Sequence, residues 1–419
     1  EDFSFYEKIK VPPPTWCPEC RSQRRMTWRN ERSLHKRTCG LTGKNIISCF
    51  SEESGIAAYE NKSWFSDQWD PLSHGREYDF SKPLFTQFGE LLKTVPMPAT
   101  FAGNSVNSDY CNHIGEAKDC YLTFASWNTE NVFYSNKIIA SKDSYDGLAS
   151  SRCQFSYEIV QSQSIYNCAF VQNSVNCNHS MFLYDCRGCS DCFGCVGLRN
   201  KQYYIFNKPY AKEEYAKKVK EFNTGGYKNF HEVLRTFTVL KHNFVHKFAH
   251  FINTQDFSGD NLSHVSNCHY CFDLADDVRD SKFCVNGGVK MADSYDGYGV
   301  GRASLLYESV DTGLNGSRML FDVVVWEGNN AFYSYHCKNV KDVFACVGLR
   351  NKQYCILNKQ YTKEEYEKLV PKIIQHMNDM PYVDSKGREY KYGEFFPPEL
   401  CPFAYNESIA QEYFPLTKD

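Results

Sequence analysis

Two cysteines near the N-terminus have a spacing that suits metal binding. Cys17 and Cys20 are separated by Pro18-Glu19 and follow three consecutive prolines. One turn can present two thiolates at this spacing to a tetrahedral zinc ion, but a structural zinc site needs four ligands. Further along the chain, Cys39 is followed by Gly-Leu-Thr, so that Thr42 stands where a fourth cysteine would complete a second pair.

Three interpretations of these cysteines are open. In the first, zinc is bound by Cys17, Cys20 and Cys39 with one irregular fourth ligand. In the second, the partner pair lies upstream of Glu1 and so outside this sequence. In the third, no metal is bound. We predict zinc as the cofactor, with ligands that can lie outside this chain.

The stretch that follows Cys20 is the most basic part of the chain. Residues 21–44 contain eight Arg or Lys and a single acid, Glu31, in a chain whose net charge is −3. These cations are Arg21, Arg24, Arg25, Arg29, Arg32, Lys36, Arg37 and Lys44. Four of the arginines recur at a spacing of four, four and three residues, which places them on one face of a helix.

This basic stretch predicts binding to nucleic acid. Arginine forks pair bidentately with phosphate, and a basic stripe beside a zinc pair is typical of nucleic-acid-binding modules. We expect contact with RNA, ribosomal RNA included, or with DNA, and the residues involved are Arg21, Arg24, Arg25, Arg29, Arg32, Lys36 and Arg37. Two alternatives stay open: the arginines pair with acidic side chains of this same chain, or they bind a protein partner.

An internal duplication organises the rest of the sequence. Residues 195–203 and 346–354 both read CVGLRNKQY, and residues 143–147 and 293–297 both read DSYDG. Both pairs of blocks are separated by about 150 residues, so a unit of that size occurs twice.

Each copy predicts short β-strands. Blocks with a polar start followed by Cys, Val, Phe, Ile or Tyr recur every 9–12 residues. We expect a mainly β fold, a duplicated parallel β-solenoid with helical inserts, in which two strands form each coil of about 20–24 residues. An antiparallel sandwich is the alternative, because its strands also recur at this spacing.

The duplication also bears on the 20 cysteines. Cys186, Cys189, Cys192 and Cys195 have the spacing of an iron–sulfur ligand run. The matching residues in the second copy are Cys337, Val340, Val343 and Cys346. Because valine cannot bind a metal, we interpret these positions as buried core, with a metal site peculiar to the first copy as the alternative. A disulfide framework is a further alternative. Because we favour free thiols in the core, and free thiols persist in a reducing compartment, we expect a cytoplasmic protein.

The remaining segments predict helices at residues 81–94, 211–222, 231–251 and 362–377. The last begins with a capping box of Thr362 and Glu365, and Pro371 should kink or split it. We divide the chain into a basic zinc-knuckle module (1–60), a helical connector (61–100), a first solenoid unit (101–208), linking helices (209–252), a second solenoid unit (253–360), and a C-terminal helix and tail (361–419).

Two further groups of residues could do chemistry. The repeated acids, which would suit a glycosidase if two carboxylates lay about 5–10 Å apart, are Asp143, Asp146, Glu158, Asp293, Asp296 and Glu308. His242, His246 and His250 recur every four residues on a predicted helix and could bind a metal. We favour a structural role for both groups. No apolar run is long enough to span a membrane.

Several segments together resemble an uncharacterised protein family of candidate phyla radiation bacteria. They include PPPTWCPECRSQRRMTWRNERSLHKRTCG, both CVGLRNKQY blocks and GEFFPPELCPFAYNESIAQEYFPL. Members of that family resemble Cys-rich repeat proteins flanked by zinc ribbons. The resemblance implies that Cys17 and Cys20 share a zinc ion with an upstream pair, and that Cys39 is the remnant of a second knuckle. It implies no activity.

The function expected from the sequence is therefore non-enzymatic binding, with nucleic acid as the partner of the arginine-rich knuckle. The alternative is a protein-interaction or assembly scaffold that uses the solenoid faces. A carbohydrate-active enzyme is the third hypothesis.

Overall fold

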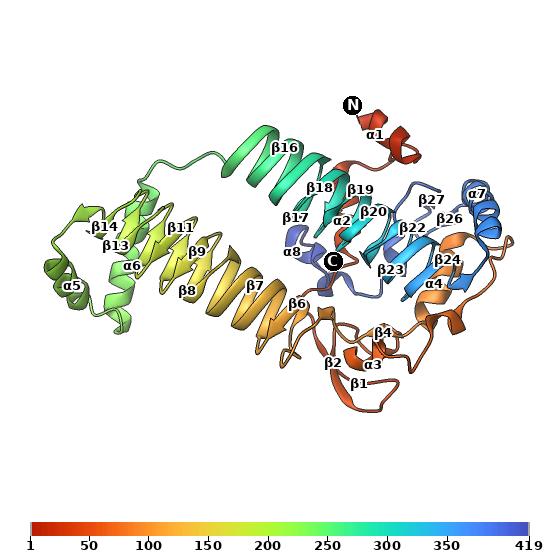
Figure 1. The fold of residues 1–419 in the computed structure, drawn as a ribbon, viewed down its shortest axis with the longest axis horizontal. Helices are drawn as coiled ribbons and strands as arrows, with labels where there is room; N and C mark the ends of the chain where they lie inside the picture. Colours follow the sequence, from red (N-terminus) through yellow and green to blue (C-terminus); the bar gives the residue numbers. More distant parts are fainter. Residues whose placement is uncertain (1, 418–419) are drawn as a thin grey trace. The chain divides into compact units, whose positions relative to one another are not determined.

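The computed structural model describes residues 2–417 and is mainly β (Figure 1). The chain divides into two compact units. The central unit is Thr100–Lys247, which contains the first copy of the duplication. The terminal unit joins the chain up to Ala99 with the chain from Phe248 onward, so the N-terminal segments pack with the second copy.

The central unit contains one large sheet of parallel strands closed by a short antiparallel pair. Its strands are β5 (Ala102–Gly103), β6 (Asn112–Lys118), β7 (Tyr121–Ser151), β8 (Gln154–Val160), β9 (Gln163–Tyr166), β10 (Ala169–Gln172), β11 (Val175–Asn178), β12 (Met181–Tyr184), β13 (Ser190–Val196), β14 (Gln202–Ile205) and β15 (Lys208–Pro209). Tyr145 pairs with Tyr157, which pairs with Ala169, so parallel partners are twelve residues apart. The expected spacing of 20–24 residues between stacked strands was wrong, because parallel partners are only twelve residues apart.

A period of three residues explains this short spacing. Between Cys153 and Cys195 every third side chain is buried, and most of these residues are Cys, Ser, Ile or Val. The residue before most of these buried positions has φ near +50°, so the backbone bends at every third residue. Such tight bending leaves room inside only for small side chains. The clustered cysteines of the first copy lie in this core, and all twenty cysteines of the chain are free.

Serine hydroxyls in the core are satisfied by the backbone. Ser150 Oγ donates to the carbonyl of Leu148 at 2.9 Å and accepts the N–H of Ser162 at 3.1 Å. The same two bonds recur one turn later, because Ser162 Oγ donates to Val160 and accepts the N–H of Ser174. A small polar side chain can therefore occupy the interior without an unpaired group.

Two helices end the central unit. They are α5 (Lys212–Glu221) and α6 (Tyr227–His242), and α6 packs Phe230 and Phe237 against Phe182. The first matches the prediction for residues 211–222. The helix expected at residues 231–251 was misplaced, since it begins at Tyr227 and ends at His242, before the two later histidines.

The terminal unit contains the second sheet of parallel strands. They are β16 (Phe251–Lys282), β17 (Val285–Gly288), β18 (Met291–Tyr298), β19 (Gly301–Val310), β20 (Gly313–Leu320), β21 (Val323–Trp326), β22 (Asn329–Phe332), β23 (Tyr335–Phe344), β24 (Arg350–Ile356) and β25 (Lys359–Gln360), the last of which pairs antiparallel with β24. Tyr295 pairs with Tyr307, twelve residues on, and Tyr307 pairs with Leu320, thirteen residues on. Val340 and Val343 lie in the core of this unit, as do Cys337 and Cys346.

Short elements from both ends of the chain complete the terminal unit. They are α1 (Asp2–Ile9), α2 (Pro18–Met26), β1 (His35–Thr38), β2 (Asn45–Ser48), β3 (Ala58–Tyr59), α3 (Asn61–Trp64), the 3₁₀ helix η1 (Pro71–His74), α4 (Leu84–Thr94), β4 (Met97–Pro98), α7 (Lys363–Asp379), β26 (Tyr382–Val383), β27 (Glu389–Tyr390), η2 (Pro398–Leu400), η3 (Tyr405–Glu407) and α8 (Ala410–Tyr413). Within residues 2–417, no helix is both long and apolar enough to cross a membrane.

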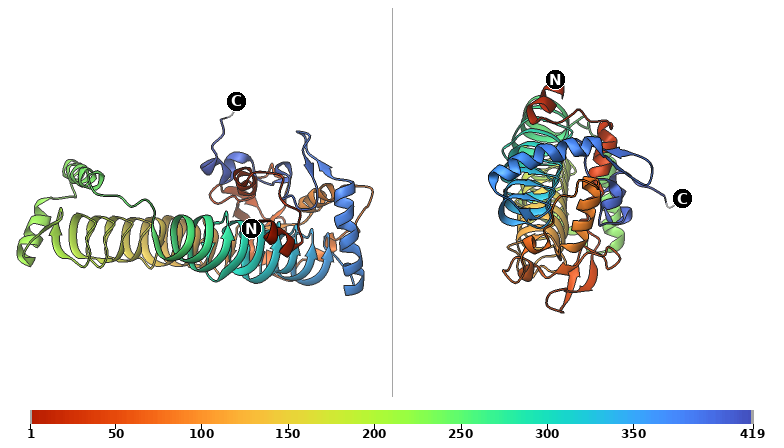
Figure 2. Two further views of the ribbon diagram at one scale, coloured as in Figure 1. Left: turned by 90° about the horizontal axis from the view of Figure 1, so that it is seen from above. Right: turned by 90° about the vertical axis from the view of Figure 1, so that its right-hand side faces the viewer.

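The helix α7 crosses the sheet at its β24 end (Figure 2). It begins with the predicted capping box, in which Thr362 Oγ1 accepts the N–H of Glu365 at 3.2 Å and Glu365 accepts the N–H of Thr362 at 2.9 Å. Pro371 lies within α7 without splitting it, contrary to one expectation.

Asp322 is a buried acid of the terminal unit that no cation pairs with in the described residues. Asp322 is fully buried, and its Oδ1 accepts the N–H of Ser334 at 2.7 Å. Its Oδ2 has no hydrogen-bond partner. Burial raises the pKa of this carboxyl well above its ordinary value, because an unpaired charge is costly in a low-dielectric core.

We predict that Asp322→Asn stabilises the terminal unit increasingly as the pH rises. The folded carboxyl holds its proton at pH values where the unfolded chain has lost it, so its contribution to stability is lost as the pH rises above about 4. The amide keeps the acceptor for Ser334 and cannot ionise. Urea unfolding followed by tryptophan fluorescence reports on this unit, since five of the six tryptophans lie in it. An advantage of the variant that does not grow between about pH 4 and pH 7 would contradict the prediction.

Candidate docking interface

The helix α2 carries Arg21, Arg24 and Arg25. It ends at Met26, so Arg29 and Arg32 lie beyond it, and the predicted single helical face of four arginines was wrong. The N-cap of α2 is Cys17, whose Sγ accepts the N–H of Cys20 at 3.3 Å, and Pro18 occupies the first turn. Proline suits that position because its fixed φ is helical and no N–H is left unpaired. The helix then places Arg21, Arg24 and Arg25 on one side, which faces the second copy.

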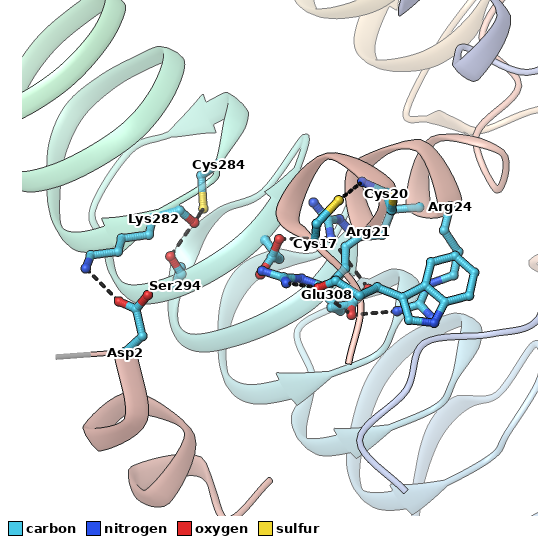
Figure 3. A network of polar contacts seen from close by, with 12 residues as sticks. Asp2, Cys17, Cys20, Arg21, Arg24, Lys282, Cys284, Ser294 and Glu308 are labelled. Atoms are coloured by element: carbon cyan, nitrogen blue, oxygen red, sulfur yellow. Dashed lines mark hydrogen bonds and ion pairs between the residues drawn. The ribbon is translucent and has the colours of Figure 1, made fainter. Parts of the chain in front are cut away.

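The three guanidinium groups meet carboxylates of β18, β19 and the C-terminal tail. Figure 3 shows Arg21 and Arg24 beside Glu308. Arg21 lies 2.7 Å from Asp296, and Arg25 lies 3.1 Å from the same carboxylate. Arg24 lies between two acids, at 2.7 Å from Glu308 and 2.8 Å from Glu394.

This arginine cluster is balanced in charge and closed to water. Three cations face three carboxylates, and the three arginine side chains are at most 3% exposed. Burial raises the pKa of Glu308 above its ordinary value, and the charges of Arg24 and Arg25 offset only part of this rise. Buried ions are stable only when they are paired and hydrogen-bonded. The helix and the sheet therefore depend on each other.

Aromatic rings extend the interface on both sides of the cluster. Phe5 of α1 stacks on Tyr295, with ring centroids 3.9 Å apart, and Tyr6 packs edge-on against Tyr307 at 5.4 Å. Arg24 also lies over the ring of Trp16 at 4.4 Å. The segment from α1 to α2 thus covers a continuous surface, which we call the acid–tyrosine face of the second copy and which consists of Tyr295, Asp296, Tyr307 and Glu308.

A fourth arginine is paired in the same way. Arg29 Nε donates to Glu31 at 2.7 Å, its Nη1 lies 3.5 Å from Asp311, and its guanidinium lies over the ring of Tyr298. Its side chain is 3% exposed.

The other predicted nucleic-acid contacts are scattered. Arg32 is 48% exposed and lies 3.4 Å from Glu412. Lys36 is exposed on β1, whereas Arg37 donates to the carbonyls of Phe50, Ser51 and Ile56.

The predicted basic stripe is therefore not a surface of the folded chain. Arg21, Arg24, Arg25 and Arg29 have the arrangement of the intramolecular alternative, and their forks are occupied by carboxylates. Phosphate contact by these four side chains would require α2 and the residues up to Arg29 to leave the sheet.

The predicted zinc ligands Cys17, Cys20 and Cys39 do not lie together in the structure. Cys17 and Cys20 are exposed and adjacent, and a hydrogen bond from Cys20 lowers the pKa of Cys17. Cys39 is buried, and its Sγ accepts the N–H groups of Thr42 and Glu60. Among residues 2–417 no cluster of three or more His, Cys, Asp or Glu side chains is placed to hold a metal ion. These residues supply two zinc ligands together, not four, and zinc stays a prediction.

The repeated acids have different environments in the two copies. Asp143 accepts a hydrogen bond from Asn131 at 2.7 Å, and Asp293 pairs with Lys8. Asp296 and Glu308 belong to the arginine cluster, an arrangement that leaves them no freedom to act as a glycosidase pair.

The three histidines do not share a helical face. His242 ends α6, while His246 bonds to the hydroxyl of Tyr184 at 3.0 Å. His250 lies beside Asp260. The alternative of a metal-binding stripe on one helix is therefore wrong, because α6 ends at His242, before His246 and His250.

Sequence reasoning missed Phe5, Tyr6 and Glu394 as parts of the interface. The recurrence of Asp146 and Glu158 as Asp296 and Glu308 was the one available signal. This recurrence identified the acids of both copies, but it could not indicate that α2 covers only Asp296 and Glu308.

Comparisons with known proteins do not assign this chain to a family. No protein-family model matches this chain, and neither does any curated protein. The resemblance to a zinc-ribbon family stays a prediction.

We predict that Arg24→Met strongly destabilises the terminal unit. The substitution removes the closest cation from both Glu308 and Glu394, and breaking a buried ion pair from one side costs about 3–5 kcal/mol. Arg32→Met is the matched control, since an exposed pair contributes about 1 kcal/mol or less. Urea unfolding at neutral pH measures both, and similar losses for the two variants would refute the prediction.

Proposed function

We propose that this chain is a non-enzymatic docking scaffold that binds protein segments on the outer face of its parallel sheets. The observation that carries this proposal is the seating of α2 and its arginines on the carboxylates of β18 and β19. It is an intramolecular example of the binding that we assign to the fold.

The scaffold in this proposal is a duplicated β-solenoid. The support is the constant parallel register of twelve or thirteen residues per turn in each sheet, together with a core of inward side chains that extends from turn to turn. Stacked turns repeat the same outer positions at about 4.8 Å, the spacing of neighbouring strands. Such repetition creates a long ordered surface from few residue types.

The geometry of that surface suits an arginine-bearing helix. Asp296 and Glu308 occupy the same position on successive turns, so their backbones are about 4.8 Å apart. Side chains three or four residues apart on a helix are separated by about 5–6 Å. This similarity lets Arg21 and Arg25 reach one carboxylate while Arg24 reaches the next.

Nucleic acid is the less favoured partner. Arg21, Arg24, Arg25 and Arg29, which sequence reasoning assigned to phosphate, are paired with carboxylates, and phosphate would have to compete with these buried acids. If α2 left the sheet, Asp296 and Glu308 would repel phosphate.

Zinc remains a separate proposal for the exposed pair. Cys17 and Cys20 would supply two thiolates at the N-terminus of α2, and the metal would stiffen the turn that begins the helix. Elemental analysis of the purified protein tests this, with Cys17→Ser/Cys20→Ser as the control. Equal zinc content in both proteins would remove these cysteines from any metal site.

We predict that the intact protein binds helical peptides in preference to nucleic acids. Panning a displayed library of helical peptides should recover binders, and fluorescence anisotropy should show them binding at least tenfold more tightly than a 20-nucleotide RNA or a DNA duplex. Measurement across a salt series separates the two modes, because phosphate binding weakens steeply with salt. Failure to recover any peptide, or salt-sensitive nucleic-acid binding tighter than peptide binding, would overturn the proposed function.

A further inference from the structure

The first copy of the duplication has its own acid–tyrosine face. Tyr145, Asp146, Tyr157 and Glu158 are the equivalents, 150 residues earlier, of Tyr295, Asp296, Tyr307 and Glu308. Their register is also the same, since Tyr145 pairs with Tyr157 as Tyr295 pairs with Tyr307.

The backbone presents the acids in the same conformation in both copies. Asp146 and Glu158 have φ of 53° and 55°, and Asp296 and Glu308 have φ of 58° and 44°. The two faces therefore have a common design, with two tyrosines in one column and two carboxylates in the next.

Downstream of the acids, the chain covers both copies. Phe170 and Phe182 continue the acid column in the central unit, and the ring of Phe230 in α6 lies 5.1 Å and 5.7 Å from them. In the terminal unit Tyr333 lies in the equivalent column, against Phe85 of α4 and Phe396 of the tail. The aromatic residues that follow the acids in this column are therefore covered in each copy.

The exposure of the acid–tyrosine face itself differs sharply between the copies. Tyr145 and Tyr157 are each 42% exposed, whereas Tyr295 is 7% exposed and Tyr307 is fully buried. Glu158 is exposed, whereas Glu308 is fully buried. In the part of the chain that the structure describes, no hydrogen bond or ion pair involves the carboxylate of Asp146 or Glu158.

Within the described residues, the two carboxylates of the first copy lack a neighbouring positive charge. Partial burial and the charge of Asp146 raise the pKa of Glu158, so two like charges lie beside each other without a cation. In the second copy, the same pair is neutralised by Arg21, Arg24 and Arg25.

We propose that Tyr145, Asp146, Tyr157 and Glu158 form a docking site for a helix of a partner protein that carries arginines three or four residues apart and an aromatic residue before them. This inference rests on the proposed function and names its site and its class of partner. The arginines of that helix pair with Asp146 and Glu158, and its aromatic residue stacks on Tyr145 as Phe5 stacks on Tyr295.

The second copy provides the probe for this site. A fluorescent peptide with the sequence of residues 2–29, in which Cys17 and Cys20 are replaced by serine, carries both the aromatic and the arginine elements of a fitting partner. We expect it to bind the intact protein saturably, with one peptide per chain. The same peptide with Arg21, Arg24 and Arg25 replaced by glutamine should bind at least tenfold more weakly.

Variants of the protein locate the bound peptide. Asp146→Asn/Glu158→Gln should lower the affinity at least tenfold, because both carboxylates lose their charge at nearly constant shape. Glu116→Gln is the matched control, since Glu116 is also exposed with φ near +50° but lies half a turn away in the twelve-residue period. Circular dichroism melts should be unchanged in both variants, because none of these side chains is buried.

Each result decides the inference. Equal affinity for the wild type and for Asp146→Asn/Glu158→Gln would overturn it, as would an equal loss in Glu116→Gln or no peptide binding at all. Self-association of the wild type that the double variant abolishes would assign the face to a second copy of this chain and overturn the partner helix. If library peptides bind the protein but do not require Asp146 and Glu158, this inference fails while the docking function stands.

Discussion

The buried contact between α2 and the second copy is the interaction on which the terminal unit depends. Asp296 and Glu308 are fully buried, and without Arg21, Arg24 and Arg25 they would be uncompensated charges. The same pairing fixes the position of the N-terminal segment and, through Glu394, that of the tail. Segments 370 residues apart thus converge on one set of charges, which is why the two ends of the chain belong to one compact unit.

Duplication followed by divergence gives the two copies different uses of one surface. Both copies keep the same parallel register, so copying the sequence also copies the acid–tyrosine face. In the second copy, the chain supplies its own arginine helix and the face becomes part of the core. In the first copy, α6 covers Phe170 and Phe182 and leaves Glu158 exposed and Asp146 half-buried. The difference lies in what covers each sheet rather than in the sheets themselves.

Much of the fold could be predicted from particular residues. The replacement of Cys189 and Cys192 by Val340 and Val343 indicated a core role, because only packing tolerates that exchange, and all four residues are buried. The capping box at Thr362 and the helix after residue 211 were also confirmed. The turn length was not predicted, since blocks 9–12 residues apart were assigned to half a coil, and the three-residue period of small side chains was overlooked. Local patterns predicted local structure well because caps and inward positions depend on near neighbours.

The sequence by itself determined that a unit occurs twice and that the clustered cysteines of the first copy serve as core, whereas the basic stretch is helical only as far as Met26. Only the tertiary structure decided what the arginines bind. A guanidinium fork accepts phosphate and carboxylate alike, so spacing and charge could not distinguish a nucleic acid from an acid elsewhere in the chain. Arg21 and Asp296 are 275 residues apart in the sequence, and their contact arises because the fold brings them together. Charge complementarity is a property of surfaces in space, and a linear sequence does not specify which surfaces meet.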